Sequence, residues 1–325
     1  MVVAFIQRAV MQGIPLLFGS TGEILTEKAG NLNLGTAGVM YVGGISGVIG
    51  AFLYEQSASQ LNPVLAILIP LLSSLLGSLI MGLIYSFLTV SLRANQNVTG
   101  LALTTFGVGI GNFFGGSLIK ITGSDVPSIT LTKTSLYFQK SLPFADKLGW
   151  FGDVFLSYSF LAYTAIIIAI IVTIFFNRTR SGLKLRAVGE NPATADAAGI
   201  NVEKYKYFSI CIGSMIAGLG GLYYVMDYAS GIWSNDGFGD RGWLAIAIVI
   251  FAIWRPNLSI IGSLLFGGLF IVHNYIHGLT FASQELIKMT PYVVTIIVLI
   301  VISMLRKREF QPPEKLGLSY FREER

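Results

Sequence analysis

The sequence predicts an all-α membrane protein, a polytopic transmembrane helix bundle with about nine spans and a range of eight to ten. Hydrophobic residues make up 53% of the 325 residues and charged residues only 12%, with a mean hydropathy of +0.69. Many apolar runs are long enough to cross a hydrocarbon core of about 30 Å at about 1.5 Å per helical residue. The runs are continuously apolar, whereas strands of an outer-membrane barrel alternate apolar and polar residues.

Each expected span is an apolar run that ends at charged residues, proline or clustered polar residues. Arg8 lies inside the first run instead of ahead of it, so we expect no cleavable signal peptide. The nine expected spans are 3–25, 35–54, 63–92, 97–119, 157–177, 204–228, 241–255, 258–277 and 289–305.

Basic residues cluster at span ends and predict the orientation of the chain. The transmembrane domain is expected at 1–305. Within it, the basic connection 178–203 is expected to be cytoplasmic and the long connection 117–156 external. The tail 306–325 is expected to be cytoplasmic, and its mixed-charge part, 311–325, to be partly disordered or to rest on a partner. The amino terminus is then external. The net charge of +5 follows from this orientation, and no nucleic-acid partner is expected.

Small residues recur at four-residue spacing inside two expected spans, which allows helix backbones to approach closely in lipid. We expect plain helix packing at both places, and a packing role for the single cysteine, Cys211. The small residues are Gly107, Gly111 and Gly115 in one span and Gly213, Ala217 and Gly221 in the other.

The connection 182–202 contains the signals of one short helix. Asn191 can cap its amino end, Pro192 fits the first helical position, and Gly199 supplies a left-handed stop. The helix has almost no apolar face, so it is expected to dock in a cleft of another protein, with Glu190, Asn191 and Asp196 available for polar contacts. A capped helix lying on the lipid surface is the alternative.

Three segments resemble the permeases of ABC importers of the branched-chain amino acid, ribose and nucleoside type. Residues 186–192 with 198–200 are similar to the coupling helix of that family, 22–40 to the opening of its nucleoside and simple-sugar subgroup, and 240–269 to its second-half signature. The bacterial guanosine-type nucleoside permeases are the most similar subgroup. The residues that correspond to the family's ATPase-coupling motif are Gly189, Glu190, Asn191, Pro192, Asp196 and Gly199.

The resemblance implies a multi-subunit importer in the bacterial cell membrane. It implies two pseudo-symmetric halves in this chain, a second permease subunit that forms a heterodimer with it, and an external substrate-binding lipoprotein or periplasmic protein. Cytoplasmic ABC ATPase subunits are expected to bind ATP and Mg, because the pattern G-x-x-x-x-G-K-[ST] is absent from this sequence. We expect no cofactor and no metal in this chain, and membrane lipid around it.

Polar residues beside irregular backbone are the expected substrate contacts, because transporters place such groups where they line a cavity. The segments 30–35, 95–99 and 230–240 meet this description. Asparagine and threonine suit a neutral polar nucleoside, and aromatic rings can stack on its base. Ordinary loops and helix packing are the alternatives. The expected pathway residues are Asn31, Asn33, Asn97, Thr104, Phe106, Phe113 and Trp233.

Other readings of the sequence predict different chemistry. A permease for ribose or another simple sugar is the first alternative. A secondary transporter is the next, but Glu23, Glu27, Asp227 and Asp240 all fall near expected span ends, and no carboxylate is expected at mid-membrane. An intramembrane metalloenzyme would need a third ligand beside His273 and His277, and none is placed with them.

Overall fold

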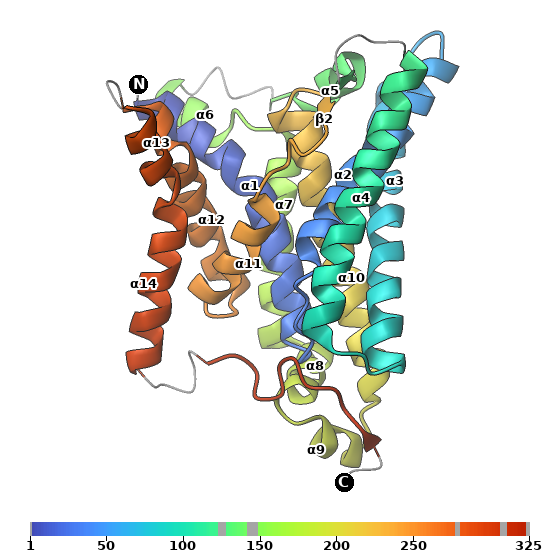
Figure 1. The fold of residues 1–325 in the computed structure, drawn as a ribbon, viewed down its shortest axis with the longest axis vertical. Helices are drawn as coiled ribbons and strands as arrows, with labels where there is room; N and C mark the ends of the chain where they lie inside the picture. Colours follow the sequence, from blue (N-terminus) through green and yellow to red (C-terminus); the bar gives the residue numbers. More distant parts are fainter. Residues whose placement is uncertain (1, 123–127, 142–148, 277–279, 306–310, 323–325) are drawn as a thin grey trace.

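The computed structural model describes residues 2–122, 128–141, 149–276, 280–305 and 311–322. Long helices run side by side along one axis of the molecule (Figure 1). The start of α1 lies at one end together with α5, α6 and α13; we call this the upper end. Helices α8 and α9 lie at the opposite, lower end, where residues 311–322 pass across them. The segments predicted to be external and cytoplasmic therefore occupy opposite ends of the bundle.

The long helices are α1 (Val2–Glu27), α2 (Thr36–Ser57), α3 (Pro63–Ser86) with its continuation η1 (Phe87–Ser91), α4 (Gln96–Thr122), α7 (Phe160–Arg178), α10 (Val202–Tyr223) with η3 (Tyr224–Tyr228), and α12 (Pro256–Ile271) with η4 (Val272–Asn274). The shorter helices are α5 (Thr132–Phe138), α6 (Gly149–Phe155), α8 (Arg180–Glu190), α9 (Pro192–Ala197), α11 (Arg241–Phe251), α13 (Phe281–Lys288) and α14 (Thr290–Leu305). Strands β1 (Ser128–Thr130) and β2 (Ile232–Ser234) pair antiparallel, with Ile129 opposite Trp233.

The prediction of an all-α polytopic membrane protein is confirmed, but the count of about nine spans is not. Among the described residues, 7 helices are long and apolar enough to cross a membrane, or up to 8 if the bent pair α13 and α14 forms one span. The expected span 241–255 falls on α11, whose 11 residues measure about 16 Å and cannot cross about 30 Å alone. The apolar run extends beyond the helix because it includes a turn in which Ile253 and Trp254 have φ of 53° and 52°.

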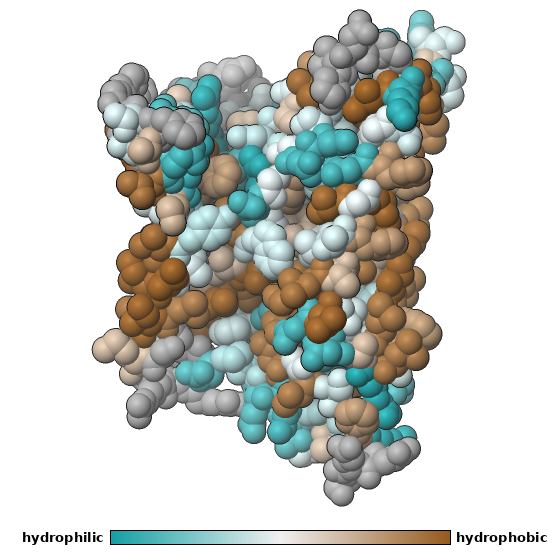
Figure 2. Space-filling view, viewed as in Figure 1, coloured by the Kyte–Doolittle hydropathy of each residue, from teal (hydrophilic) through white to brown (hydrophobic). Residues whose placement is uncertain are grey.

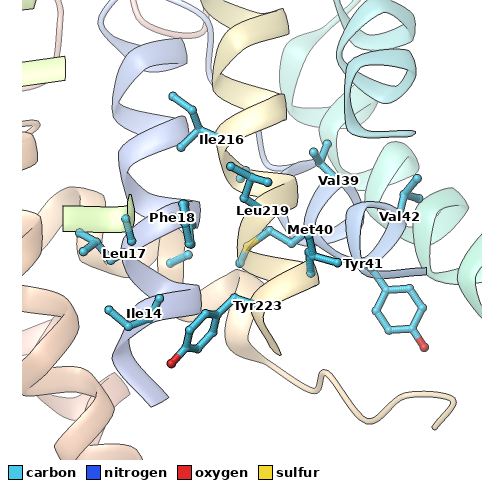
Figure 3. Packing of buried hydrophobic residues seen from close by; sticks show 14 of the residues in the cluster. Ile14, Leu17, Phe18, Val39, Met40, Tyr41, Val42, Ile216, Leu219 and Tyr223 are labelled. Atoms are coloured by element: carbon cyan, nitrogen blue, oxygen red, sulfur yellow. The ribbon is translucent and has the colours of Figure 1, made fainter. Parts of the chain in front are cut away.

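Helix α10 lies at the centre and packs against α1, α2 and α3. Figure 3 shows Ile14, Leu17 and Phe18 of α1 beside Leu219 and Tyr223 of α10, with Met40 of α2 in the same cluster. Both predicted small-residue stripes are packing sites. A side chain at Gly221 would meet the backbone of Met40, one at Gly213 the backbone of Gly22, and one at Gly107 the backbone of Gly38. Small residues allow these backbones to approach closely.

The outer surface separates into apolar flanks and a more polar strip. Exposed leucine, isoleucine and valine side chains cover α3, α7 and α14, and Figure 2 shows brown surface on both flanks of this view. Between them, pale and teal surface over the region of β2 and the upper part of α4 forms a more polar strip in the upper half of the view, and brown surface interrupts it at mid-height. Apolar flanks fit lipid contact, so the chain is a multi-pass membrane protein, and one of its faces is less apolar than lipid contact requires.

Candidate functional site

The connection between α8 and α9 has the local structure that its residues predict. Asn191 is extended, with φ −150° and ψ 93°, and its Oδ1 accepts a hydrogen bond of 3.0 Å from the Thr194 amide. Pro192 begins α9, and Gly199 follows it with φ of 79°. The Ile200 amide closes the turn by donating to the Ala195 carbonyl over 3.0 Å. The predicted cap, first position and left-handed stop are confirmed.

The expectation that this short helix has almost no apolar face is wrong. Pro192 and Ala195 of α9 are buried, and Ala195 forms a small cluster with Val188 of α8 and Val202 of α10, closed on one side by Tyr320. Residues on both sides of α9 and the carboxyl-terminal segment complete this cluster. The sequence of α9 alone therefore does not predict this cluster.

The carboxyl-terminal segment also contacts the polar residues that were expected to face a partner protein. Asp196 accepts a hydrogen bond of 2.9 Å from the Tyr320 hydroxyl and forms an ion pair of 3.2 Å with Arg322 Nε. Glu190 Oε2 accepts from the Glu314 amide over 3.4 Å. The expectation of a partly disordered tail or one resting on a partner is therefore corrected for residues 311–322, which rest on their own chain. The exposed residues of this turn are Asn191, Thr194, Ala197, Ala198 and Gly199.

A polar cavity of about 450 Å³ opens beside this helix pair. Lys28, Arg186 and Arg255 line it together with Glu190 and Trp254. Burial lowers the pKa of the Lys28 ammonium; the Glu190 carboxylate opposes this shift, and the cations of Arg186 and Arg255 add to it. The lower end of α1 is thus electrostatically linked to α8 and to the α11–α12 turn.

The loop between α1 and α2 carries the expected pathway residues Asn31 and Asn33, and side chains from two helices, α3 and α4, hold its backbone. Tyr85 of α3 donates to the Leu32 carbonyl over 2.6 Å. Gln96 of α4 accepts from the Leu32 amide over 2.7 Å, and Thr104 donates to the Leu34 carbonyl over 2.8 Å. Thr104 therefore positions this loop.

Two buried carboxylates of α1 accept hydrogen bonds in and beside this loop. Glu23 accepts from the Asn33 amide over 3.1 Å and from the Thr36 hydroxyl, while Glu27, one turn later, accepts from the Trp254 indole N–H. Sequence reasoning placed both glutamates near a span end, and they do lie in the lower part of α1, but it gave no sign that they are buried. A signal was available, since both occur in the same apolar run and one turn apart.

The two expected loop asparagines are buried instead of lining a cavity. Asn31 is 0% exposed, and neither amide atom of its side chain has a hydrogen-bond partner among the described residues. Asn33 Oδ1 accepts from the Gly35 amide over 2.9 Å. A buried amide without a partner costs about 1–3 kcal/mol, so Asn31 is the least satisfied side chain of this loop.

The remaining expected pathway residues lie elsewhere. Asn97 is exposed at the start of α4. Phe106 and Phe113 are 54% and 68% exposed, and their seven-residue separation places them on one face of α4. Trp233 is buried near the upper end, with its ring centroid 5.0 Å from that of Tyr41. The expected residues thus form three separate groups: the lower loop, the open face of α4 and the β2 region.

A polar cluster that the sequence prediction missed joins α2, α4 and the β2 connection. The Tyr41 hydroxyl donates to Asn112 Oδ1 and accepts from the Asp236 amide over 2.9 Å. Asn112 Nδ2 donates to Asp236 Oδ1 over 3.0 Å. Asp236 is exposed and Asn112 half-buried. The segment 230–240 was predicted to be irregular and polar, but its α4 partner Asn112 has no distinctive sequence context.

Arg241 is a second residue that sequence reasoning missed. It is 7% exposed at the start of α11, where its guanidinium lies 4.4 Å from the Tyr224 ring centroid and 5.2 Å from that of Phe270. It donates to the Phe238 carbonyl over 2.7 Å and to Gln12 Oε1 over 3.3 Å. Cation–π contacts and these acceptors stabilise the buried charge and join α1 to the β2 connection.

No group of three metal-ligating side chains occurs among the described residues. His273 lies in η4, and His277, its expected neighbour, is outside the described residues. The metalloenzyme alternative gains no support from this geometry.

A sequence profile of the family described as branched-chain amino acid transport system / permease component matches residues 5–302. The chain belongs to this family. The match includes every long helix described above together with α8 and α9. The chain is therefore a transport subunit of the permease type.

Curated relatives cover most of the chain. It is 32% identical over 289 residues to the nucleoside ABC transporter permease protein NupC of Lactococcus lactis, covering 88% of this chain and 87% of NupC. It is 27% identical to the guanosine ABC transporter permease protein NupQ of Bacillus subtilis, with 88% and 87% covered. The putative glucose ABC transporter permease protein TsgC13 of Haloferax volcanii is 31% identical, with 78% and 71% covered.

Proposed function

We propose that this chain is the permease subunit of an ATP-driven nucleoside importer in the bacterial cell membrane. The observation that carries the proposal is a capped helix, α9, held at the lower end of a membrane bundle of the permease family. The relatives NupC and NupQ, a nucleoside and a guanosine permease, support nucleosides as the substrate class.

The energy for transport comes from partner subunits in this proposal. The chain has no phosphate-binding loop, so cytoplasmic ABC ATPases bind ATP and Mg and α9 docks on them. Residues Thr194, Ala197 and Ala198 are exposed and small enough to enter a cleft. Closure of the ATPases then moves α8 and α9, and the paired permeases alternate access to a central cavity. An external substrate-binding protein delivers the solute.

The translocation pathway follows the polar strip of Figure 2, where a second permease subunit faces this chain. Phe106 and Phe113 on the open face of α4 offer rings for a nucleobase, a contact worth about 1–3 kcal/mol per base. Asn112 and Asp236 offer donors and acceptors that match ribose hydroxyl groups and base edges. These residues lie beside the surface along which α4 packs on α2.

Transport of a simple sugar is the second candidate, and the similarity to TsgC13 favours it. Asn112 and Asp236 also suit sugar hydroxyl groups. The exposed rings of Phe106 and Phe113 favour the nucleoside, because the flat face of a nucleobase can stack on them.

Uptake of radiolabelled guanosine, adenosine, uridine, ribose and glucose tests the proposal in cells with and without this chain, with the neighbouring genes intact. We expect loss of nucleoside uptake alone. Loss of ribose or glucose uptake alone would replace the nucleoside assignment with the sugar one, and unchanged uptake of all five would contradict both.

Substitution in the polar strip tests the pathway separately. We expect Asp236→Asn with Phe113→Ala to raise the KM for guanosine by about ten-fold or more, since the stacking contact is worth about 1–3 kcal/mol and a hydrogen bond about 1 kcal/mol. Leu136→Ala, which changes an exposed side chain of α5, is the control and should leave KM unchanged. An unchanged KM in the double variant would remove this strip from the pathway.

A further inference from the structure

Residues 311–322 form an ordered segment at the lower end of the bundle, which we call the strap (Figure 1). The strap contains no helix of more than one turn, yet Pro313 is buried and Leu316 packs against the main apolar core. It crosses three parts of the chain that are distant in sequence: the α8–α9 pair, the α1–α2 loop and the connection before α4. Each crossing is made by specific hydrogen bonds.

The first two crossings use the backbone. The Lys315 amide donates to the Gly189 carbonyl over 3.2 Å, and the Gly317 amide donates to the Gly30 carbonyl over 3.2 Å. Gly317 has φ of 80°, a conformation that favours glycine and that proline cannot adopt. Gly30 and Gly189 are themselves in contact, since a side chain on Gly189 would meet the Gly30 amide and the Lys28 carbonyl.

The third crossing reaches the start of α4. Ser319 donates to the Arg93 carbonyl over 3.3 Å, and the Arg93 guanidinium lies 4.9 Å from the Phe321 ring centroid. Gln96 donates through Nε2 to the Leu318 carbonyl over 3.4 Å while its Oε1 accepts from the Leu32 amide. One side chain of α4 therefore holds both the strap and the loop that carries Asn31 and Asn33.

The fourth crossing returns to α9. Tyr320 and Arg322 both bind the Asp196 carboxylate, at 2.9 Å and 3.2 Å, and Tyr320 closes the apolar cluster around Ala195. Helix α9 has only 6 residues, fewer than an isolated helix needs for stability in water. Its position thus depends on the strap as well as on its cap.

We propose that the strap is a coupling element: it fixes α9 to the α1–α2 loop and to the start of α4, so that force applied to α9 reaches the transmembrane helices. This inference rests on the proposed docking of α9 on an ATPase. Without the strap, α9 is held through α8 and α10. The α1–α2 loop then reaches it only through the contacts of Lys28 and Gly30 with the end of α8, and α4 loses the hydrogen bonds that the strap makes with it. The strap residues act as positioning residues and do not contact substrate.

Gly317 offers the sharpest test, because a single change there breaks one crossing and leaves the rest of the strap in place. Gly317→Pro removes the amide and the left-handed conformation together, while Gly317→Ala keeps the amide. Leu318→Ser is the matched control, since the Leu318 side chain is exposed and its hydrogen bonds are made by its backbone, which the substitution keeps. The whole importer is purified with its ATPase, and nucleoside uptake and ATP hydrolysis are measured together in proteoliposomes.

We expect Gly317→Pro to lower the uptake per ATP hydrolysed by about five-fold or more, Gly317→Ala to lower it less, and Leu318→Ser to leave it unchanged. The ATPase should still co-purify with every variant, which a general loss of folding would prevent. An unchanged ratio for Gly317→Pro would overturn the proposal. A raised uptake or tighter ATPase binding would also overturn it, since the strap would then be an inhibitory segment that the ATPase displaces.

A charge exchange tests the fourth crossing, and it does so even if the Gly317 variants misfold. Asp196→Arg alone should lower the uptake per ATP, and Asp196→Arg with Arg322→Asp should recover at least half of the loss; no recovery would contradict the pairing as a coupling contact. Failure of the wild-type chain to bind an ATPase at all is a different result. It would reject the proposed docking of α9, whereas the variants test the strap once the wild-type importer is seen to couple uptake to ATP hydrolysis.

Discussion

The α8–α9 segment and the α1–α2 loop lie side by side at the lower end of the bundle, and they were specified by the sequence in different ways. In α9, Asn191, Pro192 and Gly199 act on backbone groups within a few residues of themselves. In the loop, the backbone of Leu32 and Leu34 is held by side chains that are about 50 to 70 positions away. A local motif is readable from the chain, but a loop held by tertiary contacts is not.

The same difference separates their functional roles. The exposed residues of α9 face away from the bundle and are available to another protein. The asparagines of the loop are buried and surrounded by their own chain. In the proposed function, the α8–α9 segment binds a partner, and the loop transmits or resists movement of the helices that hold it.

Blocking the exposed side of α9 should have the largest effect if this segment binds a partner. We expect Thr194→Trp with Ala198→Trp to reduce ATP-driven uptake by about 30-fold or more, because two indole rings cannot enter a cleft shaped for small residues. Leu136→Trp, at an equally exposed position of α5, is the control. Normal uptake with the two indoles in place would show that α9 does not dock.

Removing the buried carboxylate of Glu23 should have the second-largest effect, on the stability of the α1–α2 loop. Glu23→Ala leaves the Asn33 amide without its acceptor and the Thr36 hydroxyl with only the Asn33 carbonyl, so we expect a loss of about 1–3 kcal/mol of stability. Thermal unfolding in detergent measures it. Glu203→Ala, an exposed glutamate of α10, should change little, and equal effects of both changes would contradict the buried network.

Sequence patterns predicted the helical membrane fold because each helix needs only an apolar run and its boundaries. They failed at α11, where the run includes a turn at Ile253 and Trp254, and at the strap, whose mixed charges gave no sign of its backbone bonds to Gly30 and Gly189. The cap and stop of α9 were predictable from the types of Asn191 and Gly199. The role of Asn112 was not predictable, because it depends on contacts with Tyr41 and Asp236, which are distant in sequence.

Loss of the helix cap of α9 should have the smallest effect. Asn191→Ala removes the acceptor for the Thr194 amide and costs about 1 kcal/mol, or roughly five-fold in the population of folded α9. ATPase binding measured by titration should weaken by the same factor. Asn191→Asp keeps an acceptor and should bind like wild type; equal weakening in both variants would assign Asn191 a direct contact with the partner instead.

The most direct test of the account is photo-crosslinking from one site in each region of the purified importer. A photoreactive amino acid replaces Thr194 in α9 or, as the comparison, the exposed Phe113 in α4. We predict that the probe at 194 forms an adduct with the ATPase subunit and that the probe at 113 does not, forming adducts only within the membrane. An ATPase adduct from position 113, or none from position 194, would contradict the assignment of α9 as the coupling helix.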